Sequence, residues 1–133
     1  MNGKPLISLP IHLGLGATAE ICPPFSGEME WYEAYAKRNE KDGMEGRLVS
    51  MHTFEKPWDM WEMHPSGCEV VLCTAGMILL LQENSNGEIV TIGLEPGQYV
   101  INQPGIWHTA DVHGTATAIF ITAGMGTQHR PRL

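Results

Sequence analysis

The sequence is poor in the features that mark nucleic-acid-binding and membrane proteins. Its 133 residues contain 8 Lys and Arg against 15 Asp and Glu, which gives a net charge of −7. Binding to nucleic acid or to an anionic membrane surface needs a surplus of basic side chains, so neither is expected as a partner. The longest apolar run, 77–81, is far too short to cross a bilayer.

Cysteines are also scarce. Cys22, Cys68 and Cys73 cannot all pair and have no CxxC spacing, so we expect free thiols in a reducing compartment. The first ten residues, MNGKPLISLP, lack a basic start followed by an apolar run. No signal peptide is therefore expected, and the predicted location is cytoplasmic.

The composition that remains is that of a single globular β-rich domain. The chain is 43% hydrophobic and 17% charged, which lies far from the composition of disordered proteins. Its 15 Gly and 9 Pro indicate many turns and hence short strands. A length of 133 residues suits one hydrophobic core.

Both ends of the chain differ from the middle. Residues 1–27 are rich in proline and glycine and predict an extended arm with little regular structure. Residues 28–42 predict the one helix, capped by Ser26, ended by Gly43 and packed on the domain through its aromatic residues. We thus assign residues 1–45 to an N-terminal arm and helix, and residues 126–133 to a C-terminal tail that lies on the surface or on a neighbouring subunit.

Residues 46–125 predict an all-β barrel or sandwich. Apolar and polar residues alternate with period two, and Gly- and Pro-containing turns divide the segment at regular intervals. The predicted strands are 46–54, 59–64, 69–75, 76–83, 88–94, 98–102, 107–112 and 116–123.

The stretch WEMHPSGCE, residues 61–69, places two carboxylates around one histidine. Residues two apart in a strand point to the same face, so Glu62 and His64 share a face. The turn at 65–67 returns the chain and brings Glu69 beside His64.

A second cluster, EPGQYVINQPGIWHTADV, spans residues 95–112 and contributes His108. Imidazole nitrogens and a carboxylate oxygen that converge from different strands form a metal site with open coordination positions. His64, Glu69 and His108 supply this set, and Glu62 is a candidate fourth ligand.

The spacing of the first cluster resembles the first motif of the cupin family. His64 falls at the second histidine of that motif, PSGC leads to Glu69, and VVLCTA leads to Gly76. Glu62 stands where the family usually has its first histidine, so the common set of three histidines and one glutamate is not present.

The second cluster resembles the second cupin motif, with Gly97, the strand YVIN, the turn Pro104-Gly105 and then His108. Val112 replaces the usual asparagine. The resemblance, which covers residues 46–123, implies a double-stranded β-helix, the cupin jelly-roll barrel, preceded here by one α-helix and extended arms. It also implies a homodimer, because the arms need a surface on which to lie.

Two readings of the cluster remain open. In the first, a divalent metal offsets the cost of burying Glu62 and Glu69 side by side. In the second, the same residues form a hydrogen-bonded polar pocket without an ion, as in metal-free cupins. Glu62 is either a direct ligand, a hydrogen-bond acceptor outside the ligand set, or a general base.

The other polar and aromatic residues are assigned less specific roles. His52 is predicted to be structural, with a place in the pocket as the alternative, and Cys68 and Cys73 to be an inert thiol and a small core residue. Nucleophilic catalysis by either thiol is disfavoured. His12, His113 and His129 are assigned to the surface. Tyr99 and Trp107 are predicted to pack in the core or to form a wall of the pocket. Asp111 is predicted to be a solvated carboxylate.

The predicted function is metal-dependent chemistry on a small molecule. Imidazole and carboxylate ligands suit Fe, Mn, Zn, Ni or Cu alike. The expected substrate is a small organic acid, sugar or phenolic compound, and the expected reaction is dioxygenation or isomerisation. The alternatives are a non-catalytic sensor that binds a small molecule without metal and a purely structural scaffold.

Overall fold

The alternation of residues in the middle of the chain produces strands with one buried face. In the segment 69–75, Glu69, Val71 and Cys73 are buried, while the residues between them are more exposed. Alternate side chains of a strand point to opposite faces, so one face of each strand joins a shared interior. The same pattern recurs in 47–54 and 116–122.

The computed structural model describes residues 2–133. Its elements, in chain order, are β1 (Ile11–Gly14), β2 (Thr18–Ile21), α1 (Met29–Arg38), the 3-10 helix η1 (Glu40–Glu45), β3 (Arg47–Phe54), β4 (Met60–Met63), β5 (Glu69–Ala75), β6 (Ile78–Glu83), β7 (Ile89–Leu94), β8 (Tyr99–Asn102), β9 (Trp107–Val112), β10 (Ala116–Thr122) and β11 (Gln128–Pro131).

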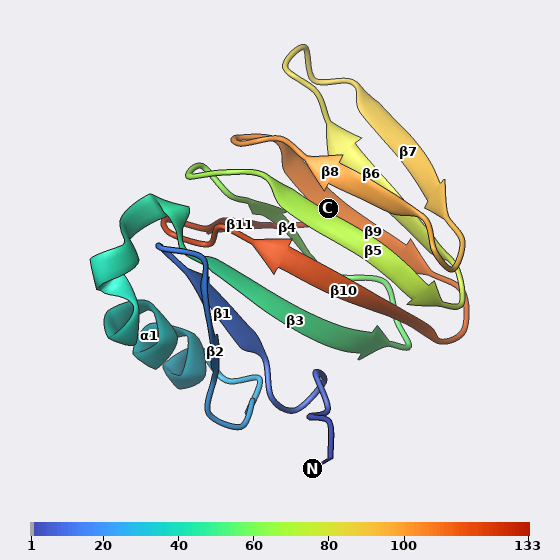
Figure 1. Ribbon diagram of the computed structural model, residues 1–133. Coiled ribbons are helices and arrows are strands. Elements are labelled where there is room, and N and C mark those ends of the chain that lie inside the picture. The colour runs from blue at the N-terminus through green and yellow to red at the C-terminus, as the bar shows by residue number, and fades with distance from the viewer. Residues whose placement is uncertain (1) are drawn as a thin grey trace.

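The strands form two antiparallel sheets (Figure 1). One has six strands in the order β2-β1-β3-β10-β5-β8, and the other has five in the order β11-β4-β9-β6-β7. The predicted fold class, an all-β jelly-roll barrel with an N-terminal α-helix, is confirmed. The core consists of Val71, Cys73, Ile78, Leu80, Leu94, Val100, Ala110, Val112, Ala116, Ala118 and Phe120.

The N-terminal segment, predicted as an extended arm with little regular structure, contains two short strands that join the barrel. Strands β1 and β2 form a hairpin, and β1 continues the six-stranded sheet by pairing Ile11 with Val49 of β3. Pro10 and Pro23 lie outside the hairpin, one on each side. Proline is tolerated at such flanking positions because no ladder N–H is required there.

The predicted helix is shorter than expected. Helix α1 ends at Arg38, and the chain continues as the 3-10 helix η1 through Gly43. Ser26 is not the N-cap residue, since Glu28 takes that position and its N–H donates to Ser26 Oγ. Neither helix has the length and apolar character needed to cross a membrane, within the described residues 2–133.

Trp31 fixes α1 to the sheet. Its side chain is buried against Cys22 and Leu48, with Tyr35 packed at the edge. Tyr32, another aromatic residue of the helix, is 39% exposed. The aromatic packing of the helix therefore rests on fewer residues than the sequence suggested.

The C-terminal tail is a strand of this chain's own five-stranded sheet. β11 pairs with β4, and the Arg130 guanidinium lies over the rings of Trp61 and Trp107, with centroid distances of 5.3 and 4.6 Å. Arg130 also pairs with Glu83. Cation–π contacts and an ion pair thus hold β11 in register. Trp107 packs on this outer face and does not line the interior.

Asp111, predicted to be a solvated carboxylate, has a side chain that is 33% exposed and also forms an ion pair. Arg132 Nη1 lies 2.8 Å from Asp111 Oδ1 and also donates to the carbonyls of Trp58 and Ala110. The pairing depends on the C-terminal strand, whose place in the sheet the sequence did not predict.

Candidate metal centre

The five-stranded sheet carries a row of polar side chains across three strands. The register pairs His129 of β11 with Glu62 of β4, and Glu62 with His108 of β9. Directly paired residues have their side chains on one face. These three residues therefore point to the same side of the sheet.

The opposing six-stranded sheet carries a matching row. Glu69 of β5 pairs with Thr122 of β10 on one side and with Asn102 of β8 on the other. Thr122 Oγ1 donates to Glu69 Oε2 at 2.6 Å, and Asn102 Nδ2 donates to Glu69 Oε1 at 3.1 Å. Both oxygens of this carboxylate are thereby held in fixed positions.

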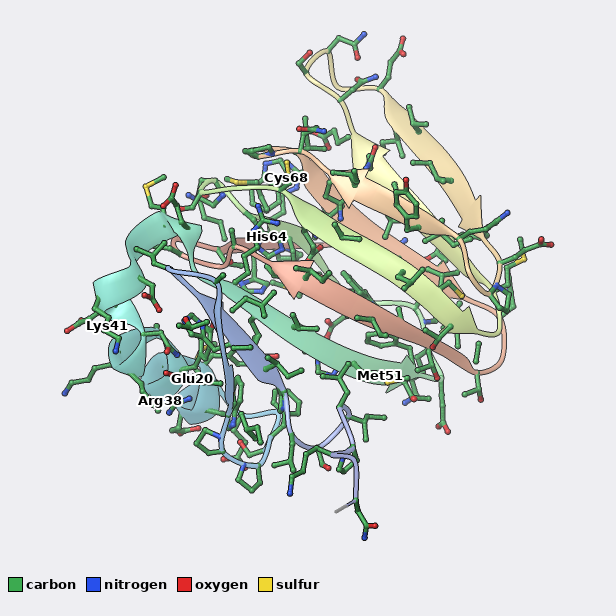
Figure 2. The ribbon with its side chains drawn as sticks, viewed as in Figure 1. Glu20, Arg38, Lys41, Met51, His64 and Cys68 are labelled. Carbon is green, nitrogen blue, oxygen red and sulfur yellow. The ribbon has the colours of Figure 1, made fainter. Side chains whose placement is uncertain are left out.

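His64 completes the cluster from the turn that follows β4. Figure 2 shows it near one end of the strands, where Cys68 also lies, whereas Met51 lies toward the other end of β3. His64, Glu69 and His108 are 5%, 3% and 0% exposed. The site is therefore close to one mouth of the barrel but largely removed from solvent.

The two histidines lie side by side, with ring centroids 5.1 Å apart, and each approaches a different oxygen of Glu69. His64 Nε2 lies 3.2 Å from Glu69 Oε2, and His108 Nε2 lies 3.1 Å from Glu69 Oε1. Neither Nε2 atom has a hydrogen-bond partner within residues 2–133, because the contacts are short but misdirected. Leaving a buried polar atom unpaired costs about 1–3 kcal/mol.

The other ring nitrogen of each histidine is satisfied. His108 Nδ1 lies 3.2 Å from the Ile106 carbonyl, which can only accept, so this nitrogen carries a proton. His64 Nδ1 lies 2.8 Å from Thr127 Oγ1, and that hydroxyl donates to the Gly124 carbonyl. In the neutral rings both Nε2 lone pairs are thus left for a cation, as in metal-binding histidines.

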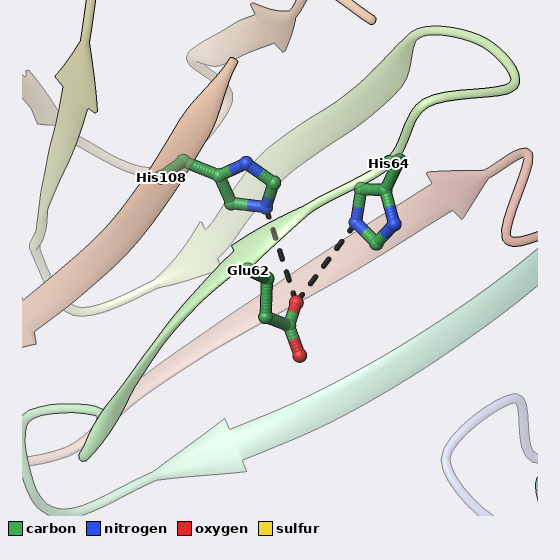
Figure 3. Close-up of side chains that lie close together, drawn as sticks. All are labelled: Glu62, His64 and His108. Atoms are coloured by element: carbon green, nitrogen blue, oxygen red, sulfur yellow. Dashed lines mark ion pairs between the residues drawn. The ribbon is translucent and has the colours of Figure 1, made fainter. Parts of the chain in front are cut away.

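Glu62 closes the cluster on its exposed side (Figure 3). Its Oε2 lies 3.9 Å from the Nε2 atoms of both His64 and His108. Its Oε1 lies 3.1 Å from His129 Nε2. The side chain of Glu62 is 30% exposed and that of His129 is 43% exposed, so this edge of the site opens to solvent.

Burial and the histidines have opposite effects on the Glu69 carboxyl. Burial raises its pKa, but the adjacent His108 and His64 outweigh burial and leave the pKa lowered. Burial likewise lowers the pKa of His108, yet Glu69 outweighs it and leaves that pKa raised. The carboxylate is therefore kept ionised, and it favours positive charge at His108.

The cluster fits a divalent cation. One ligand atom each from Glu62, His64 and His108 lie within 4.8 Å of one another, and Glu69 contacts both histidines. No Lys or Arg of residues 2–133 pairs with either carboxylate. Two imidazoles and two carboxylates form a donor set suited to first-row transition metals.

The structure brings all four predicted site residues together, although they come from β4, the turn after it, β5 and β9. Sequence reasoning missed the residues that orient them. His129 was assigned to the surface, and Thr127, Asn102 and Thr122 were not considered. Of these four residues, only Asn102 could have been predicted from the sequence. The alternation of its strand places it on the inner face with Val100.

His12 was also assigned to the surface, and this was wrong. The residue is 3% exposed, and both of its ring nitrogens are paired. Nδ1 lies 2.7 Å from the Tyr35 hydroxyl and Nε2 lies 2.6 Å from Asp42 Oδ2. This cluster ties β1 to α1 and η1. His113, by contrast, is exposed as predicted.

Other predicted roles have mixed outcomes. His52 is half-buried among aromatic rings, where burial lowers its pKa. Cys73 is fully buried, and burial raises the pKa of its thiol. Cys68 contacts Gln103. Tyr99 is 63% exposed and neither packs in the core nor lines a pocket.

Comparison with known proteins gave matches among solved structures only. No family model and no curated protein matches this chain. Peruvianin-I, a cysteine peptidase from Thevetia peruviana latex, is 22% identical with a TM-score of 0.48, over 66% of this chain and 55% of that chain. The chain thus spans just over half the length of that protein.

Two further matches are 16% identical. A cupin-2 domain protein from Shewanella frigidimarina has a TM-score of 0.49 over 65% of this chain and 71% of that chain. Hydroquinone 1,2-dioxygenase from Sphingomonas sp. TTNP3 has a TM-score of 0.48 over 57% of this chain and 59% of that chain.

Proposed function

We propose that His64, Glu69 and His108 bind one divalent metal ion, with Glu62 as a further ligand or as a base beside it. Fe, Mn, Zn, Ni and Cu all suit this donor set. The metal would serve dioxygenase- or isomerase-like chemistry on a small organic molecule. Such an ion polarises an oxygen of a bound substrate, and iron or copper also activates dioxygen.

One observation carries this proposal: two buried Nε2 atoms face a buried carboxylate without hydrogen-bond geometry. If both rings are neutral, the lone pairs of the two Nε2 atoms face those of the Glu69 oxygens, and this arrangement is unfavourable. A cation between them satisfies both nitrogens and the carboxylates. The hydrogen bonds at each Nδ1 support this, because they orient both rings for ligation.

Glu62 is the residue proposed for catalysis. Its carboxylate lies at the exposed edge of the cluster, where a substrate can reach it. A carboxylate next to a bound substrate can accept a proton from it, which isomerisation by proton transfer requires. His129 fixes one oxygen of Glu62 and leaves the other directed at the centre.

Metal analysis of untagged protein tests the proposal. We expect wild type, after reloading with Fe, Mn, Zn, Ni or Cu, to hold close to one ion per chain, and His64→Ala and His108→Ala to lose it. His113→Ala, which changes an exposed histidine in a turn, is the matched control and should retain the metal. Wild type that takes up no ion after reloading would falsify the proposal.

The second candidate function, a sensor without metal, is favoured by the short distances between Glu69 and the two rings. Protonated imidazoles at 3.1 and 3.2 Å would be held by the carboxylate charge without any ion. The sensor predicts that small-molecule binding persists after chelation and dialysis, whereas the metal centre predicts its loss.

A homodimer and a cytoplasmic location remain predictions. With the two chain ends folded as strands, we place the dimer contact on the outer face of the six-stranded sheet. Paired positions there form an aliphatic row of Ile101, Val70, Ile121, Val49 and Ile11. Two copies with a net charge of −7 each repel least across an uncharged face. Sedimentation of wild type and Val70→Lys tests this contact.

A further inference from the structure

A series of aromatic rings leads away from the candidate metal centre. Trp58 lies next to His108, with ring centroids 6.4 Å apart, and Phe120 lies 6.0 Å from Trp58. His52 follows at 5.6 Å from Phe120. These rings come from the β3–β4 connection, β10 and β3, and they lie on the inner face of the barrel.

The series continues to helix α1. Phe25 lies 5.0 Å from His52, and Tyr32 lies 5.7 Å from Phe25. The rings thus form a continuous series from the interior beside His108 to helix α1.

Several rings of the series are only half-buried. Along β3 the inner-facing side chains of Leu48 and Ser50 are buried, but His52 further along is only half-buried. Phe25 and Trp58 are half-buried as well. Half-exposed aromatic rings on the inner face of a barrel offer π surfaces on which a ligand can pack.

Trp58 adds a directed polar group to this aromatic surface. Its Nε1 is removed from solvent and has no hydrogen-bond partner within residues 2–133. The backbone is fixed, because Trp58 N–H donates to the Ala110 carbonyl at 2.9 Å and the Trp58 carbonyl accepts from Arg132. Buried indole N–H groups normally find an acceptor, so a ligand oxygen would complete this one.

We propose that the open side of the centre takes a small aromatic compound with a phenolate or carboxylate oxygen, and that Trp58 Nε1 donates to that oxygen. This inference rests on the proposed metal site and narrows its substrate class. A planar ring packs on the aromatic side chains. A sugar would need several polar partners for its hydroxyls, and the surrounding side chains are mostly apolar rings. Trp58 is thus a specificity-determining residue.

Calorimetric titration of the zinc-loaded protein tests the inference without turnover. Catechol and cis-cyclohexane-1,2-diol both carry two neighbouring oxygens, but only catechol has an aromatic ring. We expect catechol to bind at least about tenfold more tightly. Trp58→Phe keeps a ring and removes the N–H, so catechol binding should weaken roughly fivefold to tenfold while the zinc content is unchanged. Trp107→Phe, on the outer face, should bind like wild type.

A measurement on wild type covers the case in which Trp58→Phe does not fold. The indole N–H signal of Trp58, assigned by its proximity to the His108 ring, should move downfield when catechol saturates the protein. Equal binding of the two diols, or an unmoved Trp58 signal, overturns the inference while the metal site stands. Wild type that binds no zinc overturns the proposed function instead.

Discussion

Two histidine–carboxylate clusters lie in this protein, and they differ in how many ring nitrogens are paired. At His12 both nitrogens have partners, Tyr35 on one side and Asp42 on the other. At His64 and His108 only Nδ1 is paired, and Nε2 is left directed at carboxylates. All three histidines are buried.

The difference separates a structural histidine from a candidate ligand. A ring with two partners has no lone pair for a metal, and its removal leaves its partners unpaired. A ring with one partner is oriented but still offers a lone pair. Burial or proximity to a carboxylate does not distinguish the two cases, because His12 and His64 share both properties.

The largest expected effect is on metal affinity when a ligand is removed. His108→Ala should weaken metal binding by more than about a hundredfold, beyond the range typical of residues that only orient a ligand. His12→Ala should leave it within about twofold. Competition with a chelator measures both. Equal loss of metal in the two variants would mean that the clusters do not differ in function.

The next largest effect is on stability, and here the His12 cluster, not the metal cluster, is the sensitive one. His12→Ala should lower the free energy of unfolding by about 2–3 kcal/mol, because Tyr35 and Asp42 lose their partner and a buried ring is removed. His113→Ala, at an exposed turn, should change it by less than about 0.5 kcal/mol. Urea titration of metal-free protein gives both values. An unchanged midpoint for His12→Ala would show that the cluster does not hold β1 to the helices.

A smaller effect is expected where the C-terminal strand supports the ligands. Thr127→Val removes the hydroxyl that contacts His64 Nδ1 and keeps the side-chain shape. Metal affinity should fall about tenfold, as for other residues that orient a ligand. Thr117→Val changes a hydroxyl of β10 that contacts Thr53, away from the site, and is the matched control. Equal metal affinity in the two variants would show that Thr127, in the segment that leads into β11, does not orient His64 for metal binding.

The smallest expected effect is a pH dependence that belongs to the His12 cluster. The hydrogen bond with His12 lowers the pKa of Asp42 below its usual value. The unfolded state then binds this proton more readily than the folded state does. The contribution to stability is present above the unfolded pKa, about 3.9, and is lost as pH falls through the folded pKa.

Urea unfolding of wild type and Asp42→Asn measures this contribution. The gap in unfolding free energy between them should be present at pH 6 and narrow toward pH 3. A gap that stays constant with pH would show that the Asp42 charge does not contribute.

Local sequence was sufficient for much of the molecule. The eight strands predicted between 46 and 123 are all present, because their alternation and turn residues are local signals. Glu62, His64 and Glu69 could be aimed at one point because a strand and a turn fix their directions. His108 was added from a second cluster of turn and strand residues about forty residues on, and the resemblance of that segment to a second motif supported the choice.

Features that depend on contacts between residues far apart in the sequence could not be predicted from local patterns. β11 is four residues long and was taken for a tail, so His129 and Thr127 were missed. Arg130 holds that strand by lying over Trp61 and Trp107, which are far from it in sequence. The partners of His12 come from two different segments, and no local pattern indicates them.

Anomalous X-ray scattering from a zinc-loaded crystal tests the central claim most directly. The account predicts one peak per chain, about 2.0–2.1 Å from the Nε2 atoms of both His64 and His108, with a Glu69 oxygen at about 2.0–2.2 Å. A map with no peak there, and with each Nε2–H donating to Glu69 instead, would contradict it.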